Sequence, residues 1–129
     1  MEKRNLGNTG TKVGALGIGA MSFSDFYGPT NTQESHAILK MALDNGIDHI
    51  DTAKVYGMGL SEERIGQFLN TLSPNDRQFF KIATKGGIDR KNFDDKGTVV
   101  FDNSKEFLTE ELNNSLKRLG VDCVELYYV

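Results

Sequence analysis

The sequence has few of the residues that mark specialised classes of protein. It contains one cysteine, Cys123, two prolines and no tryptophan among its 129 residues. One cysteine cannot form a disulfide within the chain, and two isolated histidines, His36 and His49, provide no ligand cluster for a metal. The chain has no run of about 18 apolar residues and no apolar leader at its start. We therefore expect a protein of a reducing compartment, most simply the cytoplasm, with no metal and no membrane partner.

An excess of charge of one sign is also missing. The chain carries 15 basic and 18 acidic residues, for a net charge of −3, and the two kinds are interspersed. Such a pattern offers no basic block that could follow the phosphates of a nucleic acid or an anionic membrane. What remains is an ordinary globular composition, 38% hydrophobic and 26% charged, of about the size of one domain.

Short apolar runs alternate with amphipathic stretches along most of the chain. An initial hairpin is indicated where residues 3–6 and 12–15 flank Gly-Asn-Thr-Gly. The first helix begins after Asn31, with Glu34 three residues on, and Gly120 ends the last one. Strands are expected over 16–20, 47–51, 79–84 and 121–129, and helices over 32–45, from 61 through 69, and from 103 or 104 to 119.

Strands that alternate with helices pair in parallel through right-handed crossovers, and two architectures meet that requirement. One is an open doubly wound sheet, and the other is the first half of a (β/α)₈ barrel, since four strands in 129 residues are half of a barrel of about 250 residues. The order of elements alone does not choose between them. A dinucleotide fingerprint at Gly17-x-Gly19 is disfavoured, because Ser22 stands at the third glycine position and no helix opens there.

The neighbours of several further residues in the sequence predict less specific roles for them. Ile38 and Met41 are expected on the buried face of the first helix, with Ala42 and Asn45. Cys123 is expected to be buried in the last strand, and Lys54 to face solvent. Residues 86–102, rich in Asp, Lys and Gly, are expected to form a long flexible loop.

Function in a parallel α/β sheet gathers where strands run into the loops that follow them. Here those positions carry Gly19-Ala20-Met21, Asp51 and Lys85, and Tyr56 follows Asp51 on the same loop. An acid and an amine at neighbouring strand ends are expected to pair. A free tyrosine titrates near pH 10, and a nearby ammonium favours its ionised form. Tyr56 could then donate a proton to a carbonyl oxygen while a hydride reaches the carbon.

Five blocks of sequence resemble the aldo-keto reductase family, in family order and over nearly the whole chain. They are Leu16-Gly-Ile-Gly-Ala-Met21, Asp51-Thr-Ala-x-x-Tyr56-Gly, Ser61-Glu-Glu-x-Ile65-Gly, Ile82-Ala-Thr-Lys85-Gly and Ser115-Leu-Lys-Arg-Leu-Gly120-Val-Asp. The segments Phe26-Tyr-Gly-Pro29 and Tyr56-Gly-Met-Gly59 are similar to bacterial, fungal and plant members that resemble pyridoxal reductase. The spacing of Asp-Thr-Ala-x-x-Tyr-Gly and Ala-Thr-Lys is a specific signal.

The resemblance implies a (β/α)₈ barrel, closed at its N-terminal end by the hairpin, of which residues 1–129 are a single partial domain. It implies a catalytic tetrad in which Asp51, Tyr56 and Lys85 are the first three members. The fourth is a histidine in a pattern like Leu-Tyr-Tyr-x-His, and this sequence reads Leu126-Tyr-Tyr-Val129 to its last residue. NADP(H) is implied as the cofactor, with Gly19, Ala20, Met21 and Asp51 as the residues of this chain that would bind it.

The resulting hypothesis is an NADPH-dependent oxidoreductase that reduces small aldehydes or ketones to alcohols. The 129 residues are expected to form only part of that enzyme. Two alternatives are a truncated half-barrel without turnover, and a binding or regulatory subunit. A half-barrel has two unpaired strand edges and a sheet face open to water, expected to be apolar. Self-association that covers these edges is therefore expected. The sequence leaves open the carbonyl substrate and the choice between NADPH and NADH.

Overall fold

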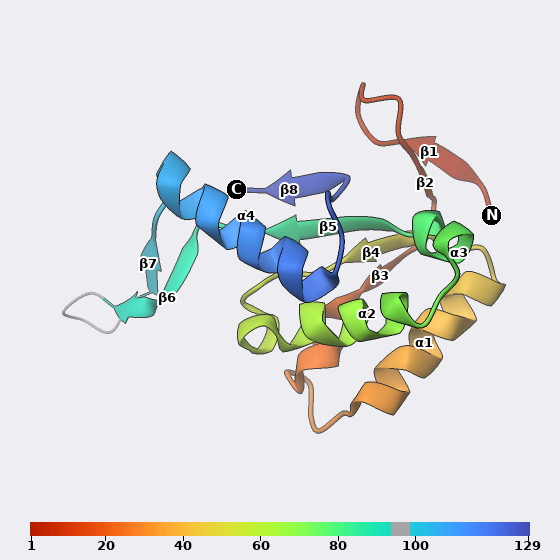
Figure 1. Ribbon diagram of the computed structural model, residues 1–129, viewed down its shortest axis with the longest axis horizontal. Helices are drawn as coiled ribbons and strands as arrows, with labels where there is room; N and C mark the ends of the chain where they lie inside the picture. The colour runs from red at the N-terminus through yellow and green to blue at the C-terminus, as the bar shows by residue number, and fades with distance from the viewer. Residues whose placement is uncertain (94–98) are drawn as a thin grey trace.

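The fold is seen in a computed structural model that describes residues 1–93 and 99–129 (Figure 1). Its strands are β1 (Lys3–Asn5), β2 (Lys12–Gly14), β3 (Gly17–Gly19), β4 (His49–Asp51), β5 (Lys81–Lys85), β6 (Ile88–Phe93), β7 (Val99–Phe101) and β8 (Leu126–Tyr128). Its α-helices are α1 (Thr32–Asp44), α2 (Leu60–Asn70), α3 (Pro74–Phe79) and α4 (Lys105–Leu119), and its short 3₁₀ helices are η1 (Ala20–Ser24) and η2 (Tyr56–Gly59).

A four-stranded parallel sheet forms the centre of the molecule, in the order β3-β4-β5-β8. Because all four strands run the same way, their carboxyl ends meet at one edge of the sheet. The β1–β2 hairpin lies at the opposite end, and the β6–β7 hairpin lies beyond the carboxyl ends (Figure 1). The predicted parallel sheet and the predicted N-terminal hairpin are confirmed.

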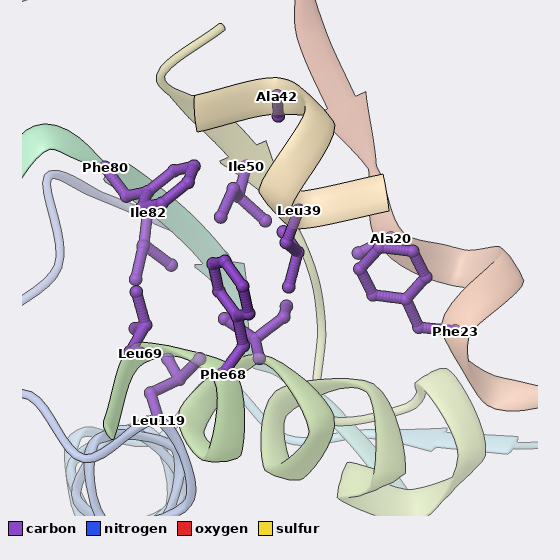
Figure 2. Close-up of a cluster of buried hydrophobic side chains, with 11 residues drawn as sticks. Ala20, Phe23, Leu39, Ala42, Ile50, Phe68, Leu69, Phe80, Ile82 and Leu119 are labelled. Atoms are coloured by element: carbon purple, nitrogen blue, oxygen red, sulfur yellow. The ribbon is translucent and has the colours of Figure 1, made fainter. Parts of the chain in front are cut away.

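The hydrophobic core lies between the sheet and the helices α1, α2 and α4. Ile50 and Ile82 share a register position on β4 and β5 and point to the helix layer. Phe68 of α2 extends between these strands and Leu39 of α1, and Leu119 of α4 closes the cluster beside Leu69 (Figure 2). Burial of these side chains is the main source of stability for the sheet and its helices.

The other face of the sheet is not apolar, contrary to the expectation from the sequence. Side chains alternate between the two faces of a strand, so the residues directly before and after Ile50 and Ile82, with their register partners, lie on the second face. The register places there mainly glycine, polar and charged residues, namely Gly17, Gly19, His49, Asp51, Lys81, Ala83, Lys85, Leu126 and Tyr128. The face left open by the helices is therefore a polar surface.

Helix α1 begins as predicted but buries a different stripe. The Asn31 side chain accepts a hydrogen bond from the Glu34 backbone N at 2.9 Å, as an N-cap does. The stripe against the core consists of Ser35, Leu39 and Ala42, one turn apart, whereas Ile38 and Met41 are 46% and 67% exposed. Apolar residues occupy two adjacent faces of this helix, and its packing on Phe68 and Ile50 selects one of them.

Three segments depart from the predicted elements. A short helix, α3, precedes β5, where Ser73 caps its first turn and Pro74 occupies the first helical position. Residues 86–102 are not one long loop, because β6 and β7 pair as an antiparallel hairpin; residues 94–98 lie outside the described part. The last strand is three residues long, and Cys123, expected in its interior, is exposed in the segment before it.

Asp48 ties the N-terminal hairpin to the amino end of the sheet. Its carboxylate pairs with the Lys3 ammonium and accepts a hydrogen bond from the Gly14 backbone N at 2.6 Å. Burial alone would raise the pKa of this carboxyl, but the bonds from Lys3 and Gly14 outweigh it and lower that pKa. Its contribution to stability is therefore present above the unfolded value of 3.8 and is lost as pH falls through the folded pKa.

We expect Asp48→Asn to lower the free energy of unfolding at neutral pH by about 1–3 kcal/mol, the range for a hydrogen bond to a charged group. The difference from wild type should disappear in acid, once Asp48 is protonated in both states. Urea unfolding across the pH range measures it. Asp44→Asn is the control, because its pair with Lys40 is exposed and is worth less than about 0.5 kcal/mol. A deficit independent of pH would contradict this prediction.

Helices α2 and α4 approach each other closely at Gly66. A Cβ atom added to Gly66 would overlap the Arg118 carbonyl oxygen. Alanine in a helix interior is ordinarily better than glycine by about 0.5–1 kcal/mol. Here we expect the opposite sign, a loss of about 1–3 kcal/mol in Gly66→Ala, because the helices must move apart.

Thermal unfolding measures this effect, with Gln67→Ala as the control. Gln67 is the next residue of the same helix and is exposed, so its replacement should change stability by less than about 0.5 kcal/mol. A stabilised Gly66→Ala variant would show that the two helices are not in contact at this point.

Candidate active site

The ammonium group of Lys85 is the centre of a polar cluster at the carboxyl edge of the sheet. Its Nζ donates to the Asp51 carboxylate, to the Thr52 carbonyl oxygen at 2.9 Å and to the Tyr56 hydroxyl at 3.2 Å. The side chains of Lys85 and Asp51 are 31% and 35% exposed, so the cluster is open to solvent on one side. The structure thus brings together Asp51, Tyr56 and Lys85, the three residues that the sequence singled out.

The backbone brings these groups together in two steps. Asp51 ends β4 and Lys85 ends β5, and the parallel pairing of these strands sets both side chains on the polar face. Tyr56 comes back to the same point through a turn in which its backbone N donates to the Ala53 carbonyl oxygen at 3.1 Å, and the chain turns again directly afterwards, with Gly57 and Met58 at φ angles of 65° and 55°. Glycine is needed at the first of these, since a Cβ atom at Gly57 would lie 2.8 Å from Ser24 Cβ.

Electrostatics favour the charged form of Lys85. Partial burial would lower the pKa of this ammonium, but its hydrogen bonds and charge interactions with Asp51 and Tyr56 outweigh burial and raise the pKa. Lys85 is therefore protonated at neutral pH, directly beside a phenol hydroxyl. This arrangement can hold a tyrosine as a proton donor, because positive charge stabilises the tyrosinate that remains after proton transfer.

Tyr128 belongs to this cluster and was not identified from the sequence. It stands opposite Lys85 in the β5–β8 register, and the Lys85 Nζ lies 5.7 Å from its ring centroid, against 5.0 Å for the Tyr56 ring. Both rings are within the range of cation–π attraction. The alternation of side chains along β8 places Tyr128 on the same face as Leu126. Its position opposite Lys85, however, depends on the register between β5 and β8, which the sequence does not specify.

The segment after β3 contributes unequally to the site. Gly19 is opposite Asp51 in the register and exposed, and a Cβ atom added to it would meet nothing within 4 Å. Met21 is half-buried, whereas Ala20 is fully buried in the core. The Ala20 carbonyl oxygen already accepts a hydrogen bond from the Ser61 hydroxyl at 2.8 Å. Gly19 and Met21 are therefore the members of this trio that solvent can reach.

A second set of charges lies on the helix side of the same strand ends. Glu62 is fully buried and accepts hydrogen bonds from Thr84 Oγ1 at 2.6 Å and from Arg118 Nε at 2.7 Å. Lys54, expected in solvent, is only 6% exposed and pairs with Glu111 of α4. The Lys54 ammonium also lies 6.0 Å from the Phe107 ring centroid, so two residues of α4 surround this side chain.

Other parts of the described chain offer no competing centre. A groove of about 690 Å³ lies at the amino ends of β5 and β8, beside Cys123 and away from Lys85. Within residues 1–93 and 99–129, no three His, Cys, Asp or Glu side chains come together in a way that could hold a metal ion. No helix in those ranges has the length and apolar character needed to cross a membrane.

Two curated relatives match almost the entire chain. An aldo-keto reductase of Schizosaccharomyces pombe, whose name specifies NADP(+), is 35% identical over 98% of this chain and 35% of its own length. L-Galactose dehydrogenase of Arabidopsis thaliana is 34% identical over 99% of this chain and 37% of its own length. The chain thus spans little more than a third of the length of these relatives.

Solved structures agree with the sequence relatives. A putative aldo-keto reductase from Pseudomonas aeruginosa superposes with a TM-score of 0.80 at 37% identity, covering 97% of this chain and 45% of that one. An aldo-keto reductase from Bacillus halodurans, in its holo form, gives 0.81 at 34% identity, covering 98% and 39%. These neighbours are (β/α)₈ barrels, so the sheet is part of a barrel and the alternative of an open doubly wound sheet is wrong.

The model of the Aldo/keto reductase family matches residues 15–129, a range that includes every side chain of the polar cluster around Lys85. The relatives of this chain come from bacteria, fungi and plants, in agreement with the subfamily resemblance seen in the sequence. With its fold, its cluster and its sequence in agreement, the chain belongs to the aldo/keto reductase family.

Proposed function

We propose that this chain supplies the proton-donating part of an NADPH-dependent oxidoreductase that reduces small aldehydes or ketones to alcohols. The observation that carries the proposal is the position of the Lys85 ammonium between the Asp51 carboxylate and the Tyr56 hydroxyl. The chain spans little more than a third of the length of its relatives, so the substrate, the cofactor and turnover are all parts of the proposal.

Tyr56 is the proton donor in this proposal. As the carbonyl carbon accepts a hydride, charge develops on the carbonyl oxygen, and the Tyr56 O–H bond breaks to give that oxygen its proton. The tyrosinate left behind is stabilised by Lys85 at 3.2 Å and regains a proton from solvent. Asp51 holds the ammonium in place, and the Thr52 carbonyl oxygen fixes it from a second direction.

The residues at the open edge fit a nicotinamide cofactor. When bound, NADPH would supply the hydride that the carbonyl carbon accepts. Gly19 leaves free space beside Asp51, into which a side chain at this position would project, and Asp51 and Met21 are both partly exposed. Ala20 could contribute through its backbone alone, since its side chain is in the core. The name of the Schizosaccharomyces pombe relative, which specifies NADP(+), supports NADP(H) as the cofactor. The single cysteine, Cys123, is exposed and free, which suits a reducing compartment such as the cytoplasm.

We expect Tyr56→Phe to lower kcat for NADPH-dependent aldehyde reduction by about 100- to 10,000-fold, the usual contribution of a general acid. NADPH binding should be retained, because the phenyl ring keeps its place beside Lys85. Initial rates in the whole protein, followed by NADPH absorbance, together with an NADPH titration, measure both. Tyr27→Phe is the matched control, since Tyr27 is 72% exposed and outside the cluster. A Tyr56→Phe variant with wild-type kcat would refute the proton-donor role.

We further propose that a species consisting of these 129 residues self-associates through the free edges of β3 and β8. Each edge presents unpaired backbone N–H and C=O groups, and the two strands run parallel. A two-fold axis along the strands would add β8 of one copy to β3 of a second copy, twice, and would close eight strands into a barrel. The polar character of the open face leaves the edges as the main contact.

Light scattering coupled to size-exclusion chromatography should therefore give a mass of twice 14.3 kDa at micromolar concentration. Dilution should shift the species toward monomer, because each contact depends on edge pairing that is weak for three-residue strands. A monodisperse monomer at all concentrations would contradict self-association and leave the proposed chemistry untouched.

A further inference from the structure

The Lys54–Glu111 pair is buried on the helix side of the loop that carries the candidate proton donor. Lys54 Nζ lies 2.6 Å from Glu111 Oε2, and the two side chains are 8% and 10% exposed. The Lys54 ammonium also lies 6.0 Å from the Phe107 ring centroid. Glu111 Oε2 is buried and has no hydrogen-bond partner within residues 1–93 and 99–129. Among these residues, the charge of Lys54 is therefore what offsets the cost of burying this carboxylate oxygen.

Lys54 lies between Asp51 and Tyr56, on the short segment that follows β4. Three residues before it, Asp51 binds Lys85, and two residues after it, Tyr56 binds the same ammonium. Thr52 Oγ1 contacts Ser61 Oγ at 2.9 Å, which holds the start of the segment against α2. Lys54 holds its second half against α4, immediately before the turn at Gly57 and Met58.

Burial makes this second attachment stiff. If the segment moved away from α4, both charges would lose their partner while still shielded from water, which is costly for buried ions. An exposed pair of the same kind, such as Lys40 and Asp44, exerts no such restraint, because water replaces either partner.

We propose that Lys54 and Glu111 are positioning residues, whose buried ion pair holds the Tyr56 hydroxyl beside Lys85. This inference rests on the proposed function, in which Tyr56 is the proton donor and its hydroxyl therefore has to be held in place. A displacement of about 1 Å at a reacting group can lower turnover by about 100-fold, so a residue outside the site can control kcat through geometry alone. Neither residue touches the reacting atoms.

The first test reports geometry and needs no turnover. In the full chain labelled with ¹³Cε-lysine, the rings of Tyr56 and Tyr128 shift the Lys85 methylene resonance at neutral pH, and Tyr56→Leu defines the shift due to the Tyr56 ring. Lys54→Met should move the resonance toward that of Tyr56→Leu, and Lys40→Met should leave it unchanged. Glu111→Asp retains both charges and removes one methylene group, so we expect it to fold even if Lys54→Met does not, and it should move the resonance the same way.

The second test reports the consequence for turnover. Lys54→Met and Glu111→Asp should lower kcat for NADPH-dependent carbonyl reduction by about 10- to 100-fold with KM for NADPH unchanged. A wild-type Lys85 resonance in folded Glu111→Asp would overturn the inference, whatever the melting temperature. If the wild-type protein reduces no carbonyl compound, the proposed function fails, while the resonance still decides whether the pair positions Tyr56.

Discussion

Lys85 carries a half-buried positive charge at the end of a parallel strand, and such a charge needs acceptors close by. The molecule provides three of them from one short segment: the Asp51 carboxylate, the Thr52 carbonyl oxygen and the Tyr56 hydroxyl. Their approach requires that β4 and β5 be adjacent, parallel and in the observed register. The loop that follows β4 also has to turn between Ala53 and Tyr56, and it turns again at Gly57, where the close contact with Ser24 admits no side chain.

The two faces of the sheet perform different tasks. The helix-facing side holds the apolar core around Phe68 and, nearer the carboxyl ends, the buried charges of Glu62 and Glu111. The opposite side is polar, and the Lys85 side chain is partly exposed there. Thr84 and Lys85 are neighbours in sequence yet belong to these two environments, because successive side chains of a strand point to opposite faces. Packing of α2 and α4 on one side thereby supports the polar cluster around Lys85 on the other.

Much of the architecture was predictable because its signals are local. Asn31 before an amphipathic stretch and Gly120 after one mark helix ends through backbone groups within a few residues. The alternation of apolar runs with helices dictated a parallel sheet. The short α3 and the β6–β7 hairpin escaped prediction, because six residues carry little periodicity and strand pairing across 94–98 depends on contacts that no local pattern encodes.

The sequence by itself determined the order of the sheet strands and of the three long helices, and it identified Asp51, Tyr56 and Lys85 as a group, because spacing along the chain specifies which groups follow which strand. The tertiary structure alone decided which side chains water can reach. Lys54 is buried because α4 lies over it, Cys123 is exposed because β8 begins later than its apolar neighbours suggest, and Met41 is exposed because Leu39 occupies the core. Tyr128 meets Lys85 only through strand register. Exposure and register arise between segments that are distant in sequence, and hence no local pattern contains them.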